Sequence, residues 1–261
     1  MTVFKPKADY SAIASTYDEA RRLPPGTIEQ WVDLIRDRGK LAPDSICLDL
    51  GCGTGRFAIP LAEIPGITVV SADLTEEMLR QAVSKPGAEK VYWVRCSAER
   101  PAFRHDVFQC VFMSLLLHHV DDMDRVLAEC FRSLRPGGLC LVRTTAHEDL
   151  DTMAIYRFFP KARAIDRNRL PDISVIEDSM RRAGFRSVRH EVVVQTPWTS
   201  IRDYLEKIRK KSISALTLLT DEEFAEGLHA LETHIASVED EASRAEMIRD
   251  QLTLVIAEKP T

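Results

Sequence analysis

Residues 47–56 constrain the fold of this chain more than any other segment. Their sequence, CLDLGCGTGR, places an apolar run that ends at Leu50 before three alternate glycines, Gly51, Gly53 and Gly55. A buried strand that ends in a glycine-rich turn and leads into a helix presents unpaired backbone N–H groups at the positive helix end. Glycine also lets the backbone approach a ligand closely and adopt positive φ angles. The segment therefore predicts an anionic or polar ligand, such as a nucleotide, on this turn.

The spacing of the glycines excludes two common phosphate-binding patterns. The dinucleotide pattern G-x-G-x-x-G needs a glycine at Arg56, and the phosphate loop G-x-x-x-x-G-K-[ST] is absent. The remaining string, DLGCGTG, resembles the first motif of the class I S-adenosylmethionine-dependent methyltransferases. The resemblance implies that Asp49, Cys52 and Thr54 join the glycines in holding S-adenosylmethionine. A glycine-rich turn without a ligand is the alternative interpretation.

A carboxylate follows the next expected strand, residues 69–72. Asp73 lies about 20 residues past the glycine turn, where a nucleotide-binding βαβ unit holds the ribose. A carboxylate suits this role because it accepts hydrogen bonds from two adjacent hydroxyls. Taken alone, Asp73 would be interpreted as a helix cap, but behind this turn ribose binding is favoured. Leu74 and Met78 are assigned to the same cofactor site.

A third expected strand, residues 91–94, is followed by a polar turn. In the family, an acidic or polar residue and a small neighbour at this place hold the edge of the adenine. Ser97 and Ala98 occupy these positions, with Glu99 beside them, and Ser97 stands where an aspartate is common. The resemblance therefore implies an adenine contact here.

The apolar run at residues 107–117 resembles the fourth motif of the family. It contains Ser114 and leads directly into His118 and His119, while Gln109 replaces the usual early acid. The resemblance places Ser114 at the cofactor. The matching segments together span about residues 10–146, just over half of the chain.

Composition and charge narrow the class of partner. The 261 residues carry a net charge of −5, and 45% of them are hydrophobic. These values exclude a disordered chain and give no electrostatic reason to bind nucleic acid. No apolar run is long enough to span a membrane, and the first residues lack an apolar signal core. We expect a cytoplasmic protein that does not enter a membrane.

The six cysteines lie between residues 47 and 140 and form no C-x-x-C pair. Zinc and thioredoxin-like sites are therefore disfavoured, and no metal is expected. Cys47, Cys110 and Cys140 fall in expected strands, where a free thiol behaves as a small buried hydrophobe. Cys52 is expected to line the cofactor site without taking part in the chemistry.

Strand-like and helical segments alternate along most of the chain. This order predicts an α/β fold, a Rossmann-like, doubly wound and mostly parallel sheet with helices on both faces. The family resemblance implies seven strands. Residues 41–198 and 250–261 are expected to form this core. Since ligands bind at the carboxyl ends of such strands, the glycine turn, Asp73, Ser97 and His118 should meet at one edge.

Four polar residues predict where helices begin. Thr27, Ser174 and Thr220 each start a capping-box pattern, with Gln or Glu three residues later. Asp122 precedes a segment with an apolar stripe and is expected to cap it.

Residues 1–40 are expected to form helices that cover the cofactor. Residues 9–18 resemble the F-x-x-I-A-x-x-Y-D helix of many small-molecule methyltransferases, which folds over the bound cofactor. The resemblance implies that Tyr17 and Arg21 reach the methionine carboxylate or the substrate, and it places Tyr10 at the substrate. An ordinary amphipathic surface helix is the alternative.

A helical insertion is expected at residues 199–249, just before the last strand. A helix starting after Thr220 carries apolar residues every three or four positions. Two interpretations stay open: a lid over the substrate, or a dimer interface or packing element. The chain is accordingly expected to be a monomer or a homodimer.

A basic stretch covers residues 157–169. Such a charge run is typical of a solvated helix face. The alternative is that one or two of its arginines bind an acidic small substrate through paired hydrogen bonds. Tyr156 and Arg157 are therefore the candidate substrate residues, for an acidic or aromatic acceptor.

The expected reaction follows from the implied cofactor. Its sulfonium already activates the methyl group, so the protein has to align an acceptor and exclude water. His118 and His119 are candidates for a general base, which is needed only if the acceptor arrives protonated. We expect methyl transfer from S-adenosylmethionine to a small molecule, with S-adenosylhomocysteine as the product. A catalytically silent cofactor-binding regulatory protein is the alternative, and a nucleic-acid methyltransferase is less favoured.

Overall fold

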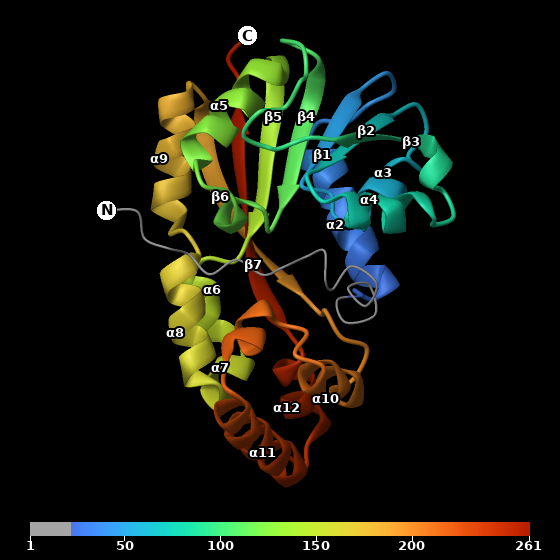
Figure 1. The fold of residues 1–261 in the computed structure, drawn as a ribbon. Helices are drawn as coiled ribbons and strands as arrows, with labels where there is room; N and C mark the ends of the chain where they lie inside the picture. Colours follow the sequence, from blue (N-terminus) through green and yellow to red (C-terminus); the bar gives the residue numbers. More distant parts are fainter. Residues whose placement is uncertain (1–21) are drawn as a thin grey trace.

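The computed structural model describes residues 22–261, which are built around one seven-stranded sheet (Figure 1). The strands are β1 (Ile46–Leu50), β2 (Thr68–Asp73), β3 (Val91–Arg95), β4 (Phe108–Ser114), β5 (Leu134–Thr144), β6 (Arg186–Gln195) and β7 (Asp250–Glu258). Their spatial order is β3-β2-β1-β4-β5-β7-β6. The strands from β3 to β5 are parallel, and β7 is antiparallel to β5 and β6. The predicted Rossmann-like, mostly parallel sheet is confirmed.

Helices fill most of the remaining described chain. They are α2 (Pro25–Arg38), α3 (Ala58–Leu61), α4 (Glu76–Val83), α5 (Met123–Ser133), α6 (His147–Thr152), α7 (Ile155–Phe158), α8 (Pro160–Arg169), α9 (Ile173–Ala183), α10 (Ile201–Arg209), α11 (Asp221–Ser237) and α12 (Glu241–Met247). Among them, none has the length and apolar character needed to cross a membrane. The helix expected over residues 9–18, with Tyr10 and Tyr17, lies outside the described residues, and so does Arg21.

Apolar side chains cover both faces of the sheet. Successive strand residues point to opposite faces, so Cys47 of β1 joins one apolar cluster and Leu48 joins the other. Helices α2 and α3 pack in the first cluster, through residues such as Trp31. Helices α5 and α9 pack in the second, through residues such as Val126. The predicted placement of helices on both faces is therefore confirmed.

Six helices gather beyond one end of the sheet (Figure 1). Helices α6–α8 follow β5, and α10–α12 fill the predicted insertion between β6 and β7. With the 3₁₀ helix Ser214–Leu218 they form a layer that we call the cap. Its two halves pack together, since the Phe159 ring lies 5.7 Å from the Phe224 ring of α11. The sequence pattern did not indicate that residues 147–169 belong to this layer.

Two of the four predicted helix starts are confirmed. The Asp122 carboxylate accepts a hydrogen bond from the N–H of Arg125 at the start of α5. Thr220 forms the predicted capping box of α11 with Glu223.

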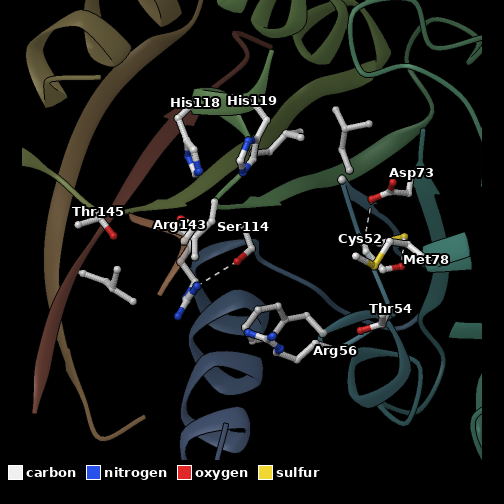
Figure 2. A pocket seen from close by; sticks show the side chains of 18 of the residues that line it. Cys52, Thr54, Arg56, Asp73, Met78, Ser114, His118, His119, Arg143 and Thr145 are labelled. Carbon is white, nitrogen blue, oxygen red and sulfur yellow. Dashed lines mark hydrogen bonds between the residues drawn. The ribbon is translucent and has the colours of Figure 1, made fainter. Parts of the chain in front are cut away.

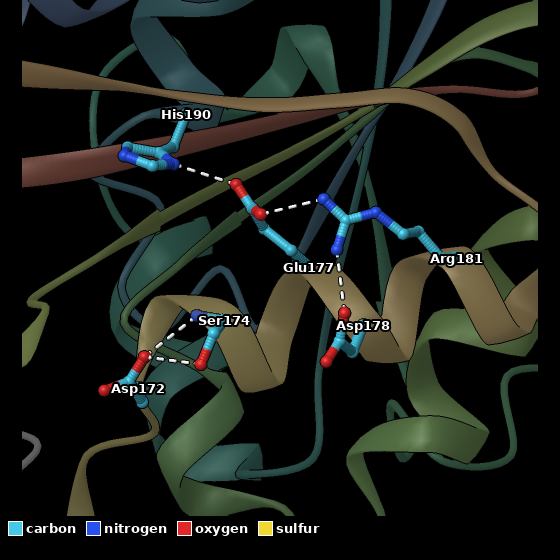
Figure 3. Close-up of polar contacts among 6 residues, drawn as sticks. All are labelled: Asp172, Ser174, Glu177, Asp178, Arg181 and His190. Carbon is cyan, nitrogen blue, oxygen red and sulfur yellow. Dashed lines mark hydrogen bonds and ion pairs between the residues drawn. The ribbon is translucent and has the colours of Figure 1, made fainter.

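The other two predicted starts are wrong. Helix α2 begins at Pro25, because proline fits the first helical turn. The Thr27 hydroxyl, inside that helix, donates instead to the carbonyl oxygen of Thr196 at 2.6 Å. Helix α9 is capped by Asp172, whose carboxylate accepts from the N–H and the hydroxyl of Ser174 at 2.9 and 2.8 Å (Figure 3).

Helix α9 is tied to the edge strand β6 by a small ionic group (Figure 3). Glu177, which was predicted to complete the capping box, accepts a hydrogen bond from His190 Nδ1 at 2.8 Å. It also pairs with Arg181 at 2.9 Å, and Arg181 pairs with Asp178. Because Glu177 points toward the sheet and not back to the start of α9, it does not form a capping box with Ser174. Asp172 occupies the N-cap position instead.

We expect Asp172→Ala to lower the free energy of unfolding by about 1 kcal/mol, because it removes the carboxylate that accepts the hydrogen bond from the Ser174 N–H at the N-terminus of α9. Ser174→Ala, the matched control, should cost clearly less. Hydrogen bonds from Ser174 hold the pKa of Asp172 below its usual range, so the difference should be present at neutral pH and lost as pH falls through that lowered pKa. Urea unfolding at pH 7 and in acid measures both effects. An equal or larger loss in Ser174→Ala would contradict the assignment.

Candidate active site

A cavity of about 500 Å³ opens where the parallel strands end. Its walls come from the ends of β1, β2, β4 and β5 and from the cap (Figure 2). The described residues that were predicted for the site and that line this cavity are Asp49, Gly51, Cys52, Gly53, Thr54, Asp73, Leu74, Met78, Ser97, Ala98, Glu99, Ser114, His118, His119 and Tyr156. The predicted meeting of these strand ends at one edge is therefore confirmed.

The carboxylate of Asp73 organises the glycine turn. Its Oδ2 accepts a hydrogen bond from the N–H of Gly53 at 2.8 Å, and its Oδ1 accepts one from Thr75 at 2.8 Å. These bonds fasten the end of β2 to the turn behind β1. Since each carboxylate oxygen has a second lone pair, Asp73 can still accept hydrogen bonds from a diol in the cavity.

The three glycines have different reasons to be glycine. All adopt positive φ, between +55° and +76°. A Cβ on Gly51 would lie 2.7 Å from the Leu116 side chain, and one on Gly55 would lie 2.6 Å from the Trp93 ring. A Cβ on Gly53 would meet no atom within 4 Å among residues 22–261. The turn is therefore open for a ligand at Gly53.

Gly55 does not line the cavity among the described residues, and the tight approach of Trp93 explains why a glycine is needed there. Its packing against β3 accounts for the glycine, and its predicted contact with a cofactor stays a prediction.

Asp49 presents a buried acceptor to the same space. It is 2% exposed, and its Oδ2 has no hydrogen-bond partner in the described part of the chain. Burial raises the pKa of Asp49 to about 7, repulsion from Asp73 adds to this, and a hydrogen bond from the Ala58 backbone opposes it. An unsatisfied acceptor in a cavity wall fits a ligand that donates a hydrogen bond, as the ammonium of S-adenosylmethionine does.

The loop after β4 brings two histidines to the cavity. The rings of His118 and His119 have centroids 3.9 Å apart, and His118 is 9% exposed. Glu99 holds the following segment, since its Oε1 accepts from the N–H groups of Asp121 and Asp122 at 2.7 and 2.8 Å. Glu99 thus combines its place in the cavity wall with a structural role.

Arg143 is the central residue that the motifs missed. It is 2% exposed and donates to Ser114 Oγ and to Gln195 Oε1, both at 3.0 Å (Figure 2). Its Cζ lies 4.6 Å from the ring centroid of Trp31, whose Nε1 also donates to Gln195 at 2.8 Å. The one available signal was an arginine inside the apolar stretch 139–145, where a buried charge needs a reason.

The cap closes the cavity with a buried ionic group. The Tyr156 hydroxyl donates a hydrogen bond to Asp166, and Arg169 pairs with the same carboxylate. Burial, together with Asp166, raises the pKa of Tyr156. Tyr156 thus lies where it was predicted. Arg157 is exposed and is not among the residues that line the cavity, because the short helix α7 turns Tyr156 inward and its neighbour outward. This position does not support its predicted contact with the substrate.

A pair of glycine variants separates ligand contact from packing. Both Gly53→Ala and Gly55→Ala place alanine at positive φ, at a cost of about 1–2 kcal/mol. Only Gly55→Ala also forces the Trp93 ring to move, so we expect it to lower the melting temperature further. Gly53→Ala should instead weaken the binding of S-adenosylhomocysteine, about tenfold or more, because its methyl group occupies the open face. Thermal unfolding and calorimetric titration measure the two effects, and equal behaviour of the variants would refute the distinction.

Asp49→Asn should stabilise the protein in a pH-dependent way. Because the pKa of Asp49 is about 7 in the folded state, wild type loses stability as pH rises from about 4 to about 7. Asparagine keeps the shape and avoids the buried charge, so the variant should gain on the order of 3–4 kcal/mol at pH 8 and about half as much at pH 5. Urea unfolding at both pH values is the measurement, with exposed Asp178→Asn as control. A gain that does not change with pH would contradict this explanation.

Comparison with known proteins gives one match to a family model and several relatives. Residues 48–142 match the model of a methyltransferase domain. The ubiquinone/menaquinone biosynthesis C-methyltransferase UbiE of Desulfotalea psychrophila is 30% identical over 138 residues. These residues are 52% of this chain and 56% of that relative, so the chain spans just over half of the relative's length.

Two solved structures share the fold across nearly the whole chain. A protein assigned as a methyltransferase of an antibiotic biosynthesis pathway in Anabaena variabilis has a TM-score of 0.76 at 19% identity, covering 91% of this chain and 99% of that one. Phosphoethanolamine N-methyltransferase 2 of Haemonchus contortus, solved with S-adenosylhomocysteine, has a TM-score of 0.62 at 20% identity, covering 96% and 58%.

The motif residues, the strand order and these matches agree. The DLGCGTG turn and Asp73 lie within the matched segment, and the sheet that carries them is shared by the solved structures. The Haemonchus contortus protein was also solved with S-adenosylmethionine. Residues 48–142 form a methyltransferase domain, which resembles the class I S-adenosylmethionine-dependent methyltransferases in sequence and fold.

Proposed function

We propose that this chain is an enzyme that transfers a methyl group from S-adenosylmethionine to a small-molecule acceptor. The observation that carries the proposal is a single cavity that runs from the glycine turn and Asp73 to the cap. A donor held at the strand ends and an acceptor held under the cap would share one space. Close, fixed placement of both partners is what an in-line transfer requires.

The cofactor half of the cavity is formed by the ends of β1, β2 and β3. In our assignment Asp73 accepts hydrogen bonds from the ribose, and the open backbone at Gly53 lies against the methionine part. Ser97 and Ala98 line the adenine end, and Asp49 offers its unpartnered oxygen to a donor. Bound S-adenosylmethionine would supply a methyl group that its sulfonium already activates.

The cysteines beside this half are suited to lining the site and not to chemistry. Burial, together with the nearby Asp49 and Asp73, raises the pKa of Cys52. Burial also raises the pKa of Cys96, with a contribution from Asp73. Both thiols stay protonated at neutral pH, so neither competes with the acceptor as a nucleophile.

The acceptor half is formed by β5, β7 and the cap. Most of its residues lie outside the matched segment 48–142, so the acceptor does not follow from the family. Enclosure by the cap favours a small molecule, as the names of the UbiE and phosphoethanolamine methyltransferase relatives also do. A net charge of −5 disfavours a nucleic acid.

Calorimetric titration with S-adenosylhomocysteine, with NAD as control, tests the proposal. We expect micromolar binding of the first and no binding of NAD. Asp73→Asn should weaken the binding by about tenfold or more. The NH₂ group of asparagine can only donate, so one of the two ribose hydroxyls would lose its acceptor. The exposed Asp178→Asn should bind like wild type. Absence of S-adenosylhomocysteine binding would refute the proposal, and binding without methyl transfer to any small acceptor would favour a cofactor-binding regulatory protein.

A further inference from the structure

In the acceptor half of the cavity, one carboxylate accepts no hydrogen bond within the part of the chain that the structure describes. Asp250 is the first residue of β7 and lines the cavity. Its side chain accepts no hydrogen bond from any residue between 22 and 261. The other acid of this half, Asp166, is satisfied by Tyr156 and Arg169. Asp250 is half-buried, so its carboxylate oxygens are available to a ligand that donates a hydrogen bond.

The groups near Asp250 define the charge that the ligand can carry. Arg143 attracts its carboxylate, and Asp149 repels it. Asp149 itself is occupied, because it accepts from the N–H of Ala146 at 2.7 Å and from the Thr253 hydroxyl at 3.0 Å.

Several charged side chains of the acceptor half lie beside an opposite charge, and the exposed Arg22 also lines the cavity. Arg143 and Asp250 offset each other, as do Arg169 and Asp166. Lys207, which also lines this half, pairs with Asp203 at 3.2 Å. A charged ligand would upset this balance in a poorly solvated space, whereas a neutral one would not.

Two aromatic side chains line the acceptor half of the cavity. Trp198 and Tyr156 line the cavity, and the ring of Tyr204 lies 4.7 Å from that of Trp198. The Tyr204 hydroxyl is buried without a partner among the described residues, and Asp250 contributes to raising the pKa of Tyr204. These rings suit a flat aromatic ligand, which packs edge to face or offset against them.

We infer that the acceptor is a neutral aromatic compound with a hydroxyl group, and that Asp250 accepts the proton of this hydroxyl during transfer. The inference rests on the proposed methyltransferase function. The hydroxyl oxygen uses a lone pair to bond to the methyl carbon, and the electron pair of the broken carbon–sulfur bond stays on sulfur. The hydroxyl proton passes to the Asp250 carboxylate and then to water.

The surroundings of Asp250 support this role. Burial raises the pKa of Asp250 to about 7, against the attraction of Arg143. A carboxylate with such a pKa takes a proton more readily than an ordinary aspartate and is still ionised in part at neutral pH. Arg143 also lines the cavity, where its positive charge favours an acceptor oxygen that has lost its proton.

The test uses four probes with one ring system on the full chain loaded with S-adenosylhomocysteine. They are 2-naphthol, its methyl ether, 2-naphthoate and 2-naphthylmethylammonium. We expect 2-naphthol to bind most tightly in calorimetry. Asp250→Asn should weaken 2-naphthol about tenfold and leave the ether and S-adenosylhomocysteine unchanged. With S-adenosylmethionine, turnover of 2-naphthol to the ether should fall about 100-fold in Asp250→Asn and return in part in Asp250→Glu. Asp178→Asn is the matched control.

Each contrary result has a separate meaning. Failure of S-adenosylhomocysteine to bind would refute the methyltransferase proposal itself. If it binds and 2-naphthol does not, or if a charged probe binds more tightly, the acceptor class is refuted. Wild-type turnover in Asp250→Asn would remove Asp250 from proton transfer and return that role to His118 or His119.

Discussion

The architecture depends on keeping one buried guanidinium satisfied. Arg143 sits in β5, yet its hydrogen bonds reach Ser114 in β4 and Gln195 in β6, and its plane lies against Trp31 of α2. A buried charge without such partners costs several kcal/mol, so these four elements have to assemble in one arrangement. Arg143, Ser114 and Gln195 also line the cavity. Stability and site geometry therefore share one set of contacts.

The two halves of the cavity arise from different kinds of chain connection. The cofactor half is built from residues 49–99, where the parallel strands β1, β2 and β3 each end in a turn at the same edge of the sheet. The acceptor half joins segments that are far apart in the sequence, such as Tyr156 and Asp250. Local motifs can keep the first half nearly constant in a family. The second half can change with the cap while the sheet stays the same.

Sequence patterns predicted the parts of the structure that depend on neighbouring residues. The ends of the strands, the open turn at Gly53 and the capping box that Thr220 forms at the start of α11 depend on residues close together in the sequence. The start of α9 was wrong because Ser174 has a competitor two residues earlier, and Glu177 is drawn to β6. Arg143 and Asp250 escaped notice because their importance comes from partners that only the folded chain brings near. Arg157 points away from the cavity because α7, itself part of the cap, turns Tyr156 inward.

The antiparallel pairing of β7 has a consequence for how the cap is attached. Gln195, the last residue of β6, is paired with Asp250, the first residue of β7, so the chain leaves the sheet and returns to it at facing positions. Helices α10–α12 therefore replace the short turn that would otherwise connect the antiparallel strands β6 and β7. Their length and sequence can be exchanged without shifting the register of the sheet, since lengthening a loop costs little once its ends are held together. The protein thus combines a fixed sheet with an exchangeable helical segment. The two residues at which this segment joins the sheet, Gln195 and Asp250, both line the cavity.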